Sequence, residues 1–150
     1  AFLTQTTLSA DDTATIVEAR KARYPAIVAP RADDICYATS NRQMAVKQIA
    51  AECELVLVIG APNSSNSLRL VEVAERCGAK ARLIQRGADI NPAWLEGVRT
   101  LGLTAGASAP ETLVREAADR LAELRTITER EEVTATEEQM IFKLPRELTE

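Results

Sequence analysis

The stretch "ELVLVIGAPNSSNSLRLVEVAERCGAKARLIQ", residues 54–85, decides the fold of this chain. Residues 54–60 form a continuous apolar run that ends in a glycine, which is typical of a central strand in a parallel sheet. Residues 65–77 carry apolar side chains on one helical face, and Gly78 ends the predicted helix. Residues 80–85 predict a second strand. A strand, a helix and a strand in this order predict a parallel pair joined by a crossover helix.

The same alternation continues on both sides of this stretch. On the amino-terminal side it predicts a strand, a helix, a short extended segment and a second helix, at residues 1–7, 9–24, 26–30 and 40–53. On the carboxyl-terminal side it predicts a helical turn, a strand, a helix and a closing strand, at residues 91–97, 99–105, 110–124 and 140–144. We therefore expect an α/β fold, a parallel sheet with helices on both faces.

The composition is that of an ordinary globular domain. The chain has 150 residues, of which 46% are hydrophobic and 27% charged, enough to bury a core. A net charge of -4 and an aromatic content of 3% argue against a nucleic-acid-binding surface. No apolar run approaches the roughly 18 residues of a membrane span, and no signal-peptide pattern is present, so we expect a cytoplasmic protein. The sequence starts at Ala1 without a methionine, which favours a piece of a longer or processed chain.

The cysteine and histidine counts restrict the chemistry. The chain has no histidine, which removes the commonest general base and metal ligand. Its three cysteines are too far apart for a CxxC metal motif, and their number does not suggest a disulfide framework. Cys53 and Cys77 each close a predicted helix on its apolar face, where a small buried hydrophobic residue is the favoured interpretation. Cys36 precedes a hydroxyl-rich helix start that would stabilise a thiolate. A nucleophile, one ligand of a metal cluster and a core residue all remain open for it.

Four segments, each taken as the carboxyl end of a predicted strand, are rich in Ser, Thr or Asn: residues 4–9, 36–43, 60–67 and 104–111. Three of them lead into a helix N-terminus. Ligands of open α/β sheets bind beyond the carboxyl ends of the strands. A helix N-terminus there offers unpaired N–H groups and a partial positive charge, so added hydroxyls would make an anion site. Helix capping explains any single loop of this kind, because Ser, Thr and Asn are preferred N-caps. The run "NSSNS" exceeds what one cap requires, and several such loops favour a phosphate or another anion.

The sequence lacks two common nucleotide-binding motifs, and its remaining charged patterns are typical of a solvent-exposed surface. The chain has neither a GxxxxGK[ST] P-loop nor a GxGxxG fingerprint. Arg42 and Arg69 lie near helix starts, and we interpret them as solvent-facing rather than as anion ligands. The run "EREE", residues 129–132, is typical of a solvated face or a linker.

Six motifs, in their order along the chain, resemble the carboxyl-terminal half of the LytB/IspH family, the 4-hydroxy-3-methylbut-2-enyl diphosphate reductases. They are "TQTTLS", "DDICYATSNRQ", "PNSSNS", "RLVEVAERCGAKARLI", "DI…WL.GV" and "GLTAGASAPETLV". The closing "IFKLPRELTE" resembles the family's carboxyl-terminal end. The resemblance covers nearly the whole chain.

The resemblance implies a fold of three related α/β domains around a 4Fe-4S cluster, which is held by three cysteines, one from each domain. Residues 1–32 would then end the middle domain, residues 33–124 would form the third, and residues 125–150 would form a tail with a closing strand. The implied reaction is the reductive dehydration of the hydroxylated diphosphate to isopentenyl and dimethylallyl diphosphate, the last step of the methylerythritol phosphate route to isoprenoids. The implied electron donor is a ferredoxin or a flavodoxin.

The resemblance also implies roles for individual residues. Cys36 would be the third cluster ligand, Thr6 a proton-relay member near the substrate hydroxyl, and Thr39 a weaker candidate beside the cluster ligand. The implied diphosphate-binding set is Ser64, Ser65, Asn66 and Ser108. Leu68 departs from the polar residue that the family usually has at this position. The other two cluster cysteines, the substrate-binding histidines and the proton-donating glutamate belong to the family's amino-terminal half. We therefore expect this chain to be inactive on its own.

Two alternatives come from other classes of function. One is a stand-alone phosphate-binding or phosphosugar-binding α/β module in which Cys36 is incidental, and such a module would carry neither iron nor sulfide. The other is a non-catalytic truncated partner of a complete reductase. The coding sequence upstream of Ala1 would separate this second alternative from an ordinary enzyme.

Overall fold

A three-stranded parallel sheet with the strand order β2-β1-β3 forms the centre of the chain. The computed structural model describes residues 1–29 and 35–134. The strands are β1 (Leu55–Ile59), β2 (Lys80–Ile84) and β3 (Leu101–Ala105). β1 pairs along its whole length with both neighbours, and all of its residues are buried. Burial on both faces explains why the sequence of β1 is a continuous apolar run.

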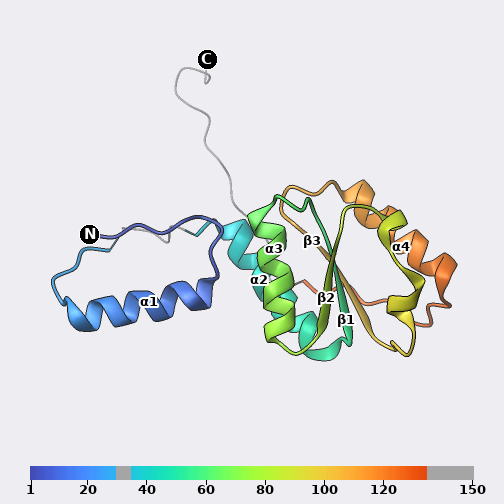
Figure 1. Cartoon of the computed structure of the whole chain (residues 1–150), viewed down its shortest axis with the longest axis horizontal. Helices are drawn as coiled ribbons and strands as arrows, with labels where there is room; N and C mark the ends of the chain where they lie inside the picture. The colour runs from blue at the N-terminus through green and yellow to red at the C-terminus, as the bar shows by residue number, and fades with distance from the viewer. Residues whose placement is uncertain (30–34, 135–150) are drawn as a thin grey trace, which may run out of the picture.

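Helices cover both faces of this sheet (Figure 1). The helices α2 (Tyr37–Glu52) and α3 (Ser65–Arg76) pack on one face, and α4 (Glu111–Leu124) packs on the other. Two short 3-10 helices, η1 (Gly87–Asp89) and η2 (Pro92–Leu95), lie between β2 and β3 in the chain. Each face has its own apolar cluster, one around Val58 and Leu70 and the other around Leu57 and Ala117. The expected α/β fold with helices on both faces is confirmed.

The boundaries of the central elements agree with the sequence pattern to within one or two residues. The helix α1 (Ala10–Arg23) begins as predicted at Ser9, whose Oγ accepts a hydrogen bond of 3.3 Å from the Asp12 N–H. The helix α2 begins at Tyr37 instead of the expected Ser40. The carbonyl oxygen of Cys36 accepts hydrogen bonds from the N–H groups of Thr39 and Ser40, so the preceding residues already form the first helical turn.

The strand expected over residues 1–7 is wrong, since these residues form no strand. The Phe2 N–H donates a hydrogen bond of 3.2 Å to the Val28 carbonyl oxygen. This bond joins residues 1–7 to residues 26–29, the described part of the segment that was expected to be extended. A strand requires a partner that continues this pairing, and the described residues provide none. The closing strand expected over residues 140–144 lies outside the described residues.

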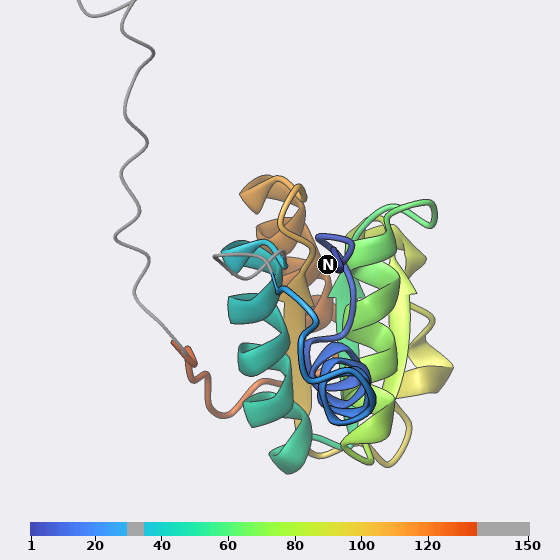
Figure 2. The ribbon, with the colours of Figure 1, turned by 90° about the vertical axis from the view of Figure 1, so that its left-hand side faces the viewer.

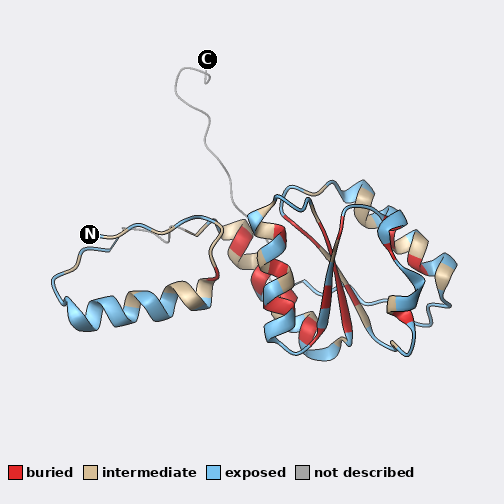
Figure 3. Cartoon of the chain, in the orientation of Figure 1, coloured by how far each residue is buried: buried red, intermediate tan, exposed pale blue. Residues whose placement is uncertain are grey.

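Residues 1–29, which we call the N-terminal arm, extend away from the sheet (Figure 1). Figure 2 shows α1 end-on, in front of the layer formed by α2 and α3, and Figure 1 shows it extending to one side of that layer. None of the residues of α1 is buried, and Figure 3 shows this helix mostly exposed whereas the strands and the inner sides of α2 and α3 are buried. Four large apolar side chains of the arm are exposed: Leu3, Ile16, Tyr24 and Val28.

The three cysteines have different environments. Cys53 is partly buried and packs against the core cluster on the α2 and α3 face, as expected. Burial raises the pKa of its thiol, and the charge of Glu52 adds to this effect. Cys77 was expected in the core but is exposed. It occupies the C-cap of α3, one position beyond the helix, where the chain already turns toward Gly78. Cys36 is exposed as well.

Candidate functional site

The loops after β1 and β3 meet at the carboxyl edge of the sheet. Ile59 and Ala105 are paired at the ends of their strands, and the N–H of Gly106 donates a hydrogen bond of 2.8 Å to the carbonyl oxygen of Ile59. Gly60 and Gly106 therefore lie at the starts of two neighbouring loops. Each of these loops leads into a helix, α3 or α4. Of the four segments expected at strand ends, residues 60–67 and 104–111 follow β1 and β3 as predicted. Residues 4–9 and 36–43 follow no strand among the described residues, so that part of the prediction is wrong.

The side chain of Ser67 fills the space between these two loops. Ser67 is only 1% exposed. A Cβ atom built on Gly60 would lie 2.1 Å from Ser67 Oγ, and one built on Gly106 would lie 2.4 Å from the same atom. Both distances are far below van der Waals contact, so glycine at both positions makes room for this hydroxyl. Ser67 was not among the predicted site residues.

Ser64 caps α3 from the same loop. Its Oγ accepts hydrogen bonds from the backbone N–H and from the hydroxyl of Ser67, at 3.3 and 3.1 Å. Ser65 is exposed at the first position of the helix, where backbone N–H groups have no intrahelical partner. The capping explanation is thus correct for Ser64, while the neighbouring hydroxyl of Ser65 is available to a ligand.

Asn66 contributes a polar group for which the described residues provide no partner. Its Oδ1 atom is buried, and no described residue donates a hydrogen bond to it. Buried polar atoms in folded proteins are nearly always paired. This oxygen can only accept a hydrogen bond, so it needs a donor from a ligand or from protein outside the described ranges.

Ser108 lies in the turn after β3 and is exposed. The turn is closed by a hydrogen bond of 3.0 Å from the Ala109 N–H to the Gly106 carbonyl. Pro110 occupies the N-cap of α4 and makes no side-chain capping bond. The hydroxyl of Ser108 does not serve as a helix cap, so capping does not explain this serine.

Cys36 occupies the N-cap of α2, and its side chain makes no capping hydrogen bond. Its backbone N–H donates a hydrogen bond of 3.1 Å to the carbonyl oxygen of Thr6. The structure therefore brings Thr6 and Cys36 together, and both residues are exposed. Thr39 is only 4% exposed, in the first turn of the same helix.

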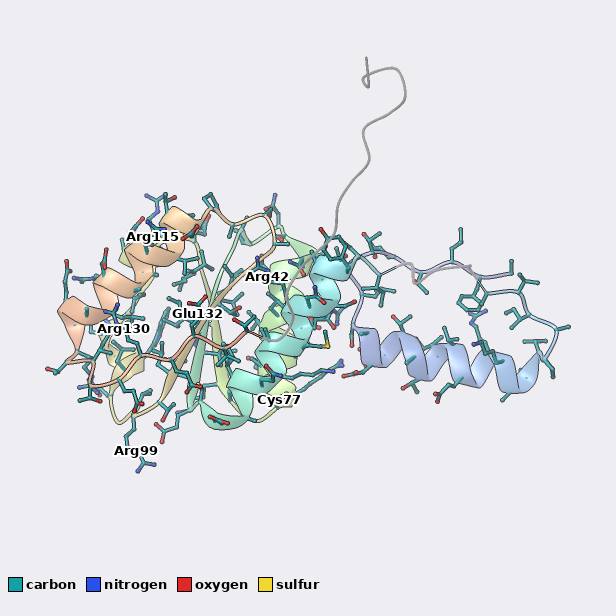
Figure 4. All side chains as sticks on the ribbon, turned by 180° about the vertical axis from the view of Figure 1, so that it is seen from behind. Arg42, Cys77, Arg99, Arg115, Arg130 and Glu132 are labelled. Atoms are coloured by element: carbon teal, nitrogen blue, oxygen red, sulfur yellow. The ribbon has the colours of Figure 1, made fainter. Side chains whose placement is uncertain are left out.

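Arg42 connects the start of α2 to the end of β3. Its Nη1 donates a hydrogen bond of 3.4 Å to the carbonyl oxygen of Ala105, and the residue is half-buried. This position corrects the expectation that Arg42 faces solvent, because the side chain crosses from α2 to the sheet edge. Figure 4 shows Arg42 at this end of the layer formed by α2 and α3, and Cys77 at the opposite end. Arg69 instead forms an ion pair with Glu72 on its own helix.

Gln43 joins the N-terminal arm to α2, and sequence reasoning missed it. Its side chain is only 1% exposed. Its Nε2 donates to the carbonyl oxygen of Leu8 at 2.9 Å, and its Oε1 accepts from the N–H of Ala10 at 3.1 Å. The available signal was its spacing: Gln43 precedes Val46 and Ala50 on the buried face of α2. A polar residue on such an apolar face needs partners.

Two ion pairs attach the start of α1 to the layer formed by α2 and α3. Asp11 pairs with Lys47 of α2 at 2.6 Å, and Asp12 pairs with Arg76 of α3 at 2.8 Å. The hydrogen bond from Arg76 lowers the pKa of Asp12, with smaller contributions from the charge of Arg76 and from Ser9. Together with Gln43, these pairs fix the arm where Thr6 approaches Cys36.

The lowered pKa predicts a pH dependence of this attachment. A carboxyl whose pKa is lower in the folded state stabilises that state above its ordinary pKa of 3.8, and the contribution is lost as the pH falls through the folded value. In a full-length protein, we expect Asp12→Asn to lower the thermal midpoint slightly at about pH 7 and less at about pH 3. Asp119→Asn on α4 is the control. An equal difference at both pH values would exclude the ion pair as its cause.

Within residues 1–29 and 35–134, no group of three or more His, Cys, Asp or Glu side chains could hold a metal ion. Cys36 fits as a single ligand, because its thiol is exposed and makes no capping bond. No helix in the same part of the chain is long and apolar enough to cross a bilayer.

Comparisons with known proteins agree with this arrangement. The profile of a family described as "LytB protein" matches residues 1–122. The chain is 60% identical over 148 residues to the 4-hydroxy-3-methylbut-2-enyl diphosphate reductase of Phenylobacterium zucineum, covering 99% of this chain and 47% of that protein. It is 56% identical over 147 residues to the reductase of the same name from Actinobacillus succinogenes, covering 98% of this chain and 46% of that protein. The chain thus spans about half the length of these relatives.

Two solved structures are also similar. One is the E-1-hydroxy-2-methyl-but-2-enyl-4-diphosphate reductase from Plasmodium falciparum, with a TM-score of 0.77 and 38% identity over 80% of this chain and 38% of that one. The other is an (E)-4-hydroxy-3-methyl-but-2-enyl diphosphate reductase, described as the terminal enzyme of the non-mevalonate pathway. It has a TM-score of 0.57 and 29% identity, and the match covers 79% of this chain and 42% of that one.

Proposed function

This chain belongs to the LytB family, and we propose that it is the carboxyl-terminal part of a 4-hydroxy-3-methylbut-2-enyl diphosphate reductase. The observation that carries the proposal is the gathering of its motif residues at one edge of the sheet. Ser64, Ser65 and Ser108 lie on the loops after β1 and β3, and Arg42 joins that edge to the first turns of α2, where Cys36 lies. The proposed anion site and the proposed thiol ligand would therefore lie at the same end of the fold.

The proposed diphosphate site uses hydroxyl and backbone donors. The first turn of α3 supplies N–H groups and a partial positive charge, and Ser64, Ser65 and Ser108 add hydroxyl groups from two loops. The amide nitrogen of Asn66 would add a further donor. Its buried oxygen, for which the described residues provide no donor, can only accept and would need a donor other than the diphosphate. Diphosphate oxygens accept such hydrogen bonds, and bonds to charged acceptors are the stronger ones. This set would fix the position of the rest of the substrate.

Cys36 is proposed as one ligand of a 4Fe-4S cluster, whose other cysteines would come from the remainder of the full-length protein. When bound, such a cluster supplies electrons and a Lewis-acidic iron. Thr6 lies next to Cys36 through the backbone hydrogen bond already described. We propose that its hydroxyl relays a proton to the departing substrate hydroxyl. The overall reaction breaks that C–O bond, consumes two electrons and two protons, and releases water.

The domain arrangement is part of the same proposal. Residues 1–32 would end the middle domain, residues 33–124 would form the third, and residues 125–150 the tail. The exposed apolar side chains of the N-terminal arm support this division, because they would be covered if a larger domain packed on them. The boundary itself, and residues 135–150 of the tail, lie outside the described residues. A ferredoxin or flavodoxin is the proposed electron donor, and the cytoplasm the proposed location.

The experiment is an analysis of the full-length protein. We expect the anaerobically purified protein to contain iron and sulfide, and to convert 4-hydroxy-3-methylbut-2-enyl diphosphate to isopentenyl and dimethylallyl diphosphate with a reduced donor. We expect residues 1–150 alone to be inactive, since one cysteine ligand cannot hold a cluster of this kind. A full-length protein that binds phosphate but contains neither iron nor sulfide would support a simple phosphate-binding module instead.

A further inference from the structure

Ser67 is buried behind the proposed diphosphate loop and contacts the residues that shape it. Its Oγ lies where a Cβ atom of either Gly60 or Gly106 would fall, so it sits between the ends of β1 and β3. Its exposed fraction of 1% leaves no contact with solvent or with a ligand. Any effect of this hydroxyl on a ligand must therefore pass through a neighbouring group.

That neighbour is Ser64. A serine hydroxyl has one proton to donate and two lone pairs that accept. The backbone N–H of Ser67 donates to Ser64 Oγ at 3.3 Å, and the hydroxyl of Ser67 approaches the same atom at 3.1 Å. Among the described residues, Ser64 Oγ is the hydrogen-bond partner of the Ser67 hydroxyl. A buried hydroxyl needs an acceptor, so Ser67 donates its proton to Ser64.

Both lone pairs of Ser64 Oγ are then occupied, and its own proton remains as the group's free donor. Ser64 is half-buried at the mouth of the loop, beside exposed Ser65. We propose that Ser67 is a positioning residue that holds Ser64 as a hydrogen-bond donor toward the diphosphate. This inference rests on the proposed function of the loop. It also explains why Gly60 and Gly106 are glycines: a side chain at either position would occupy the space of the Ser67 hydroxyl.

The test is a double-mutant cycle in the full-length protein, with inorganic diphosphate as the probe and calorimetry as the measurement. Ser67→Ala removes the donor and keeps the Cβ atom. We expect it to raise the Kd for inorganic diphosphate about 3–10-fold, the effect of losing one ordinary hydrogen bond. In turnover, KM should rise while kcat stays nearly constant. In the Ser64→Ala background, Ser67→Ala should have no further effect. Ala74→Gly, in the same helix but away from the loop, should lower stability without changing this Kd.

A second variant displaces the hydroxyl instead of removing it. Gly60→Ala places a Cβ atom in the space of Ser67 Oγ, and we expect a similar rise in Kd. An unchanged Kd in Ser67→Ala, with a raised Kd in Ser64→Ala, would overturn the positioning role alone. An equal effect of Ser67→Ala in both backgrounds would overturn it too, because the two serines would then act independently. An unchanged Kd in Ser64→Ala would instead overturn the proposed diphosphate site.

Discussion

Replacing Cys36 by serine in the full-length protein is expected to remove most of its bound iron and sulfide and to lower turnover by more than about 100-fold. Loss of an outer-shell partner of a metal site already reduces metal affinity or activity by about 10–100-fold, and a direct ligand should matter more. The position of Cys36 supports this expectation, because its thiol is exposed at the N-cap of α2 and forms no capping bond.

Cys77→Ser is the matched control for this experiment. Cys77 is also exposed, but it lies at the end of α3 far from the proposed site (Figure 4). We expect the control to keep its iron, sulfide and turnover. If both variants behaved alike, Cys36 would not be a cluster ligand, and its thiol at the N-cap of α2 would have no role in binding iron.

The second large effect is expected at Gln43. In Gln43→Leu, the carbonyl oxygen of Leu8 and the N–H of Ala10 both lose their partner. A buried polar group left unpaired costs about 1–3 kcal/mol. The free energy of unfolding should therefore fall by a few kcal/mol in denaturant titrations. Because these bonds hold the segment that follows Thr6, we expect kcat to fall as well.

Gln48→Leu makes the matched comparison, since Gln48 lies on the same helix and is exposed. We expect it to change the free energy of unfolding little, as surface substitutions usually do. Equal losses in the two variants would show that the helix tolerates leucine poorly in general. The amide of Gln43 would then not be what joins the arm to α2.

Most of the fold follows from sequence because its elements are defined locally. The buried strand β1 is a continuous apolar run, and α3 and α4 each show one apolar stripe before a clear end. The strand expected over residues 1–7 was wrong for a non-local reason. An apolar stretch becomes a strand only beside another strand, and the described part of this chain offers residues 1–7 no such neighbour.

The exposed and half-buried residues of the candidate site could be named from the sequence, but the fully buried ones could not. Ser64, Ser65 and Ser108 belong to recognisable hydroxyl-rich loops at helix starts, so their place at the sheet edge followed from the strand order. Gln43 and Ser67 act through contacts with distant or neighbouring loops, which a one-dimensional pattern does not contain. The prediction for Cys77 failed in the opposite direction, since a residue expected to be buried is exposed. Its spacing matches the apolar face of α3, but the helix ends one residue before it.

The central claim is that the loops after β1 and β3 together bind the diphosphate of the substrate. The most direct measurement is the calorimetric Kd of inorganic diphosphate for the full-length protein and for its Ser64→Ala, Ser108→Ala double variant. Each hydrogen bond to a charged group contributes about 1.5–3 kcal/mol, so we predict a Kd at least about 100-fold higher in the double variant. An unchanged Kd, in a double variant that remains folded and keeps its iron, would contradict the account.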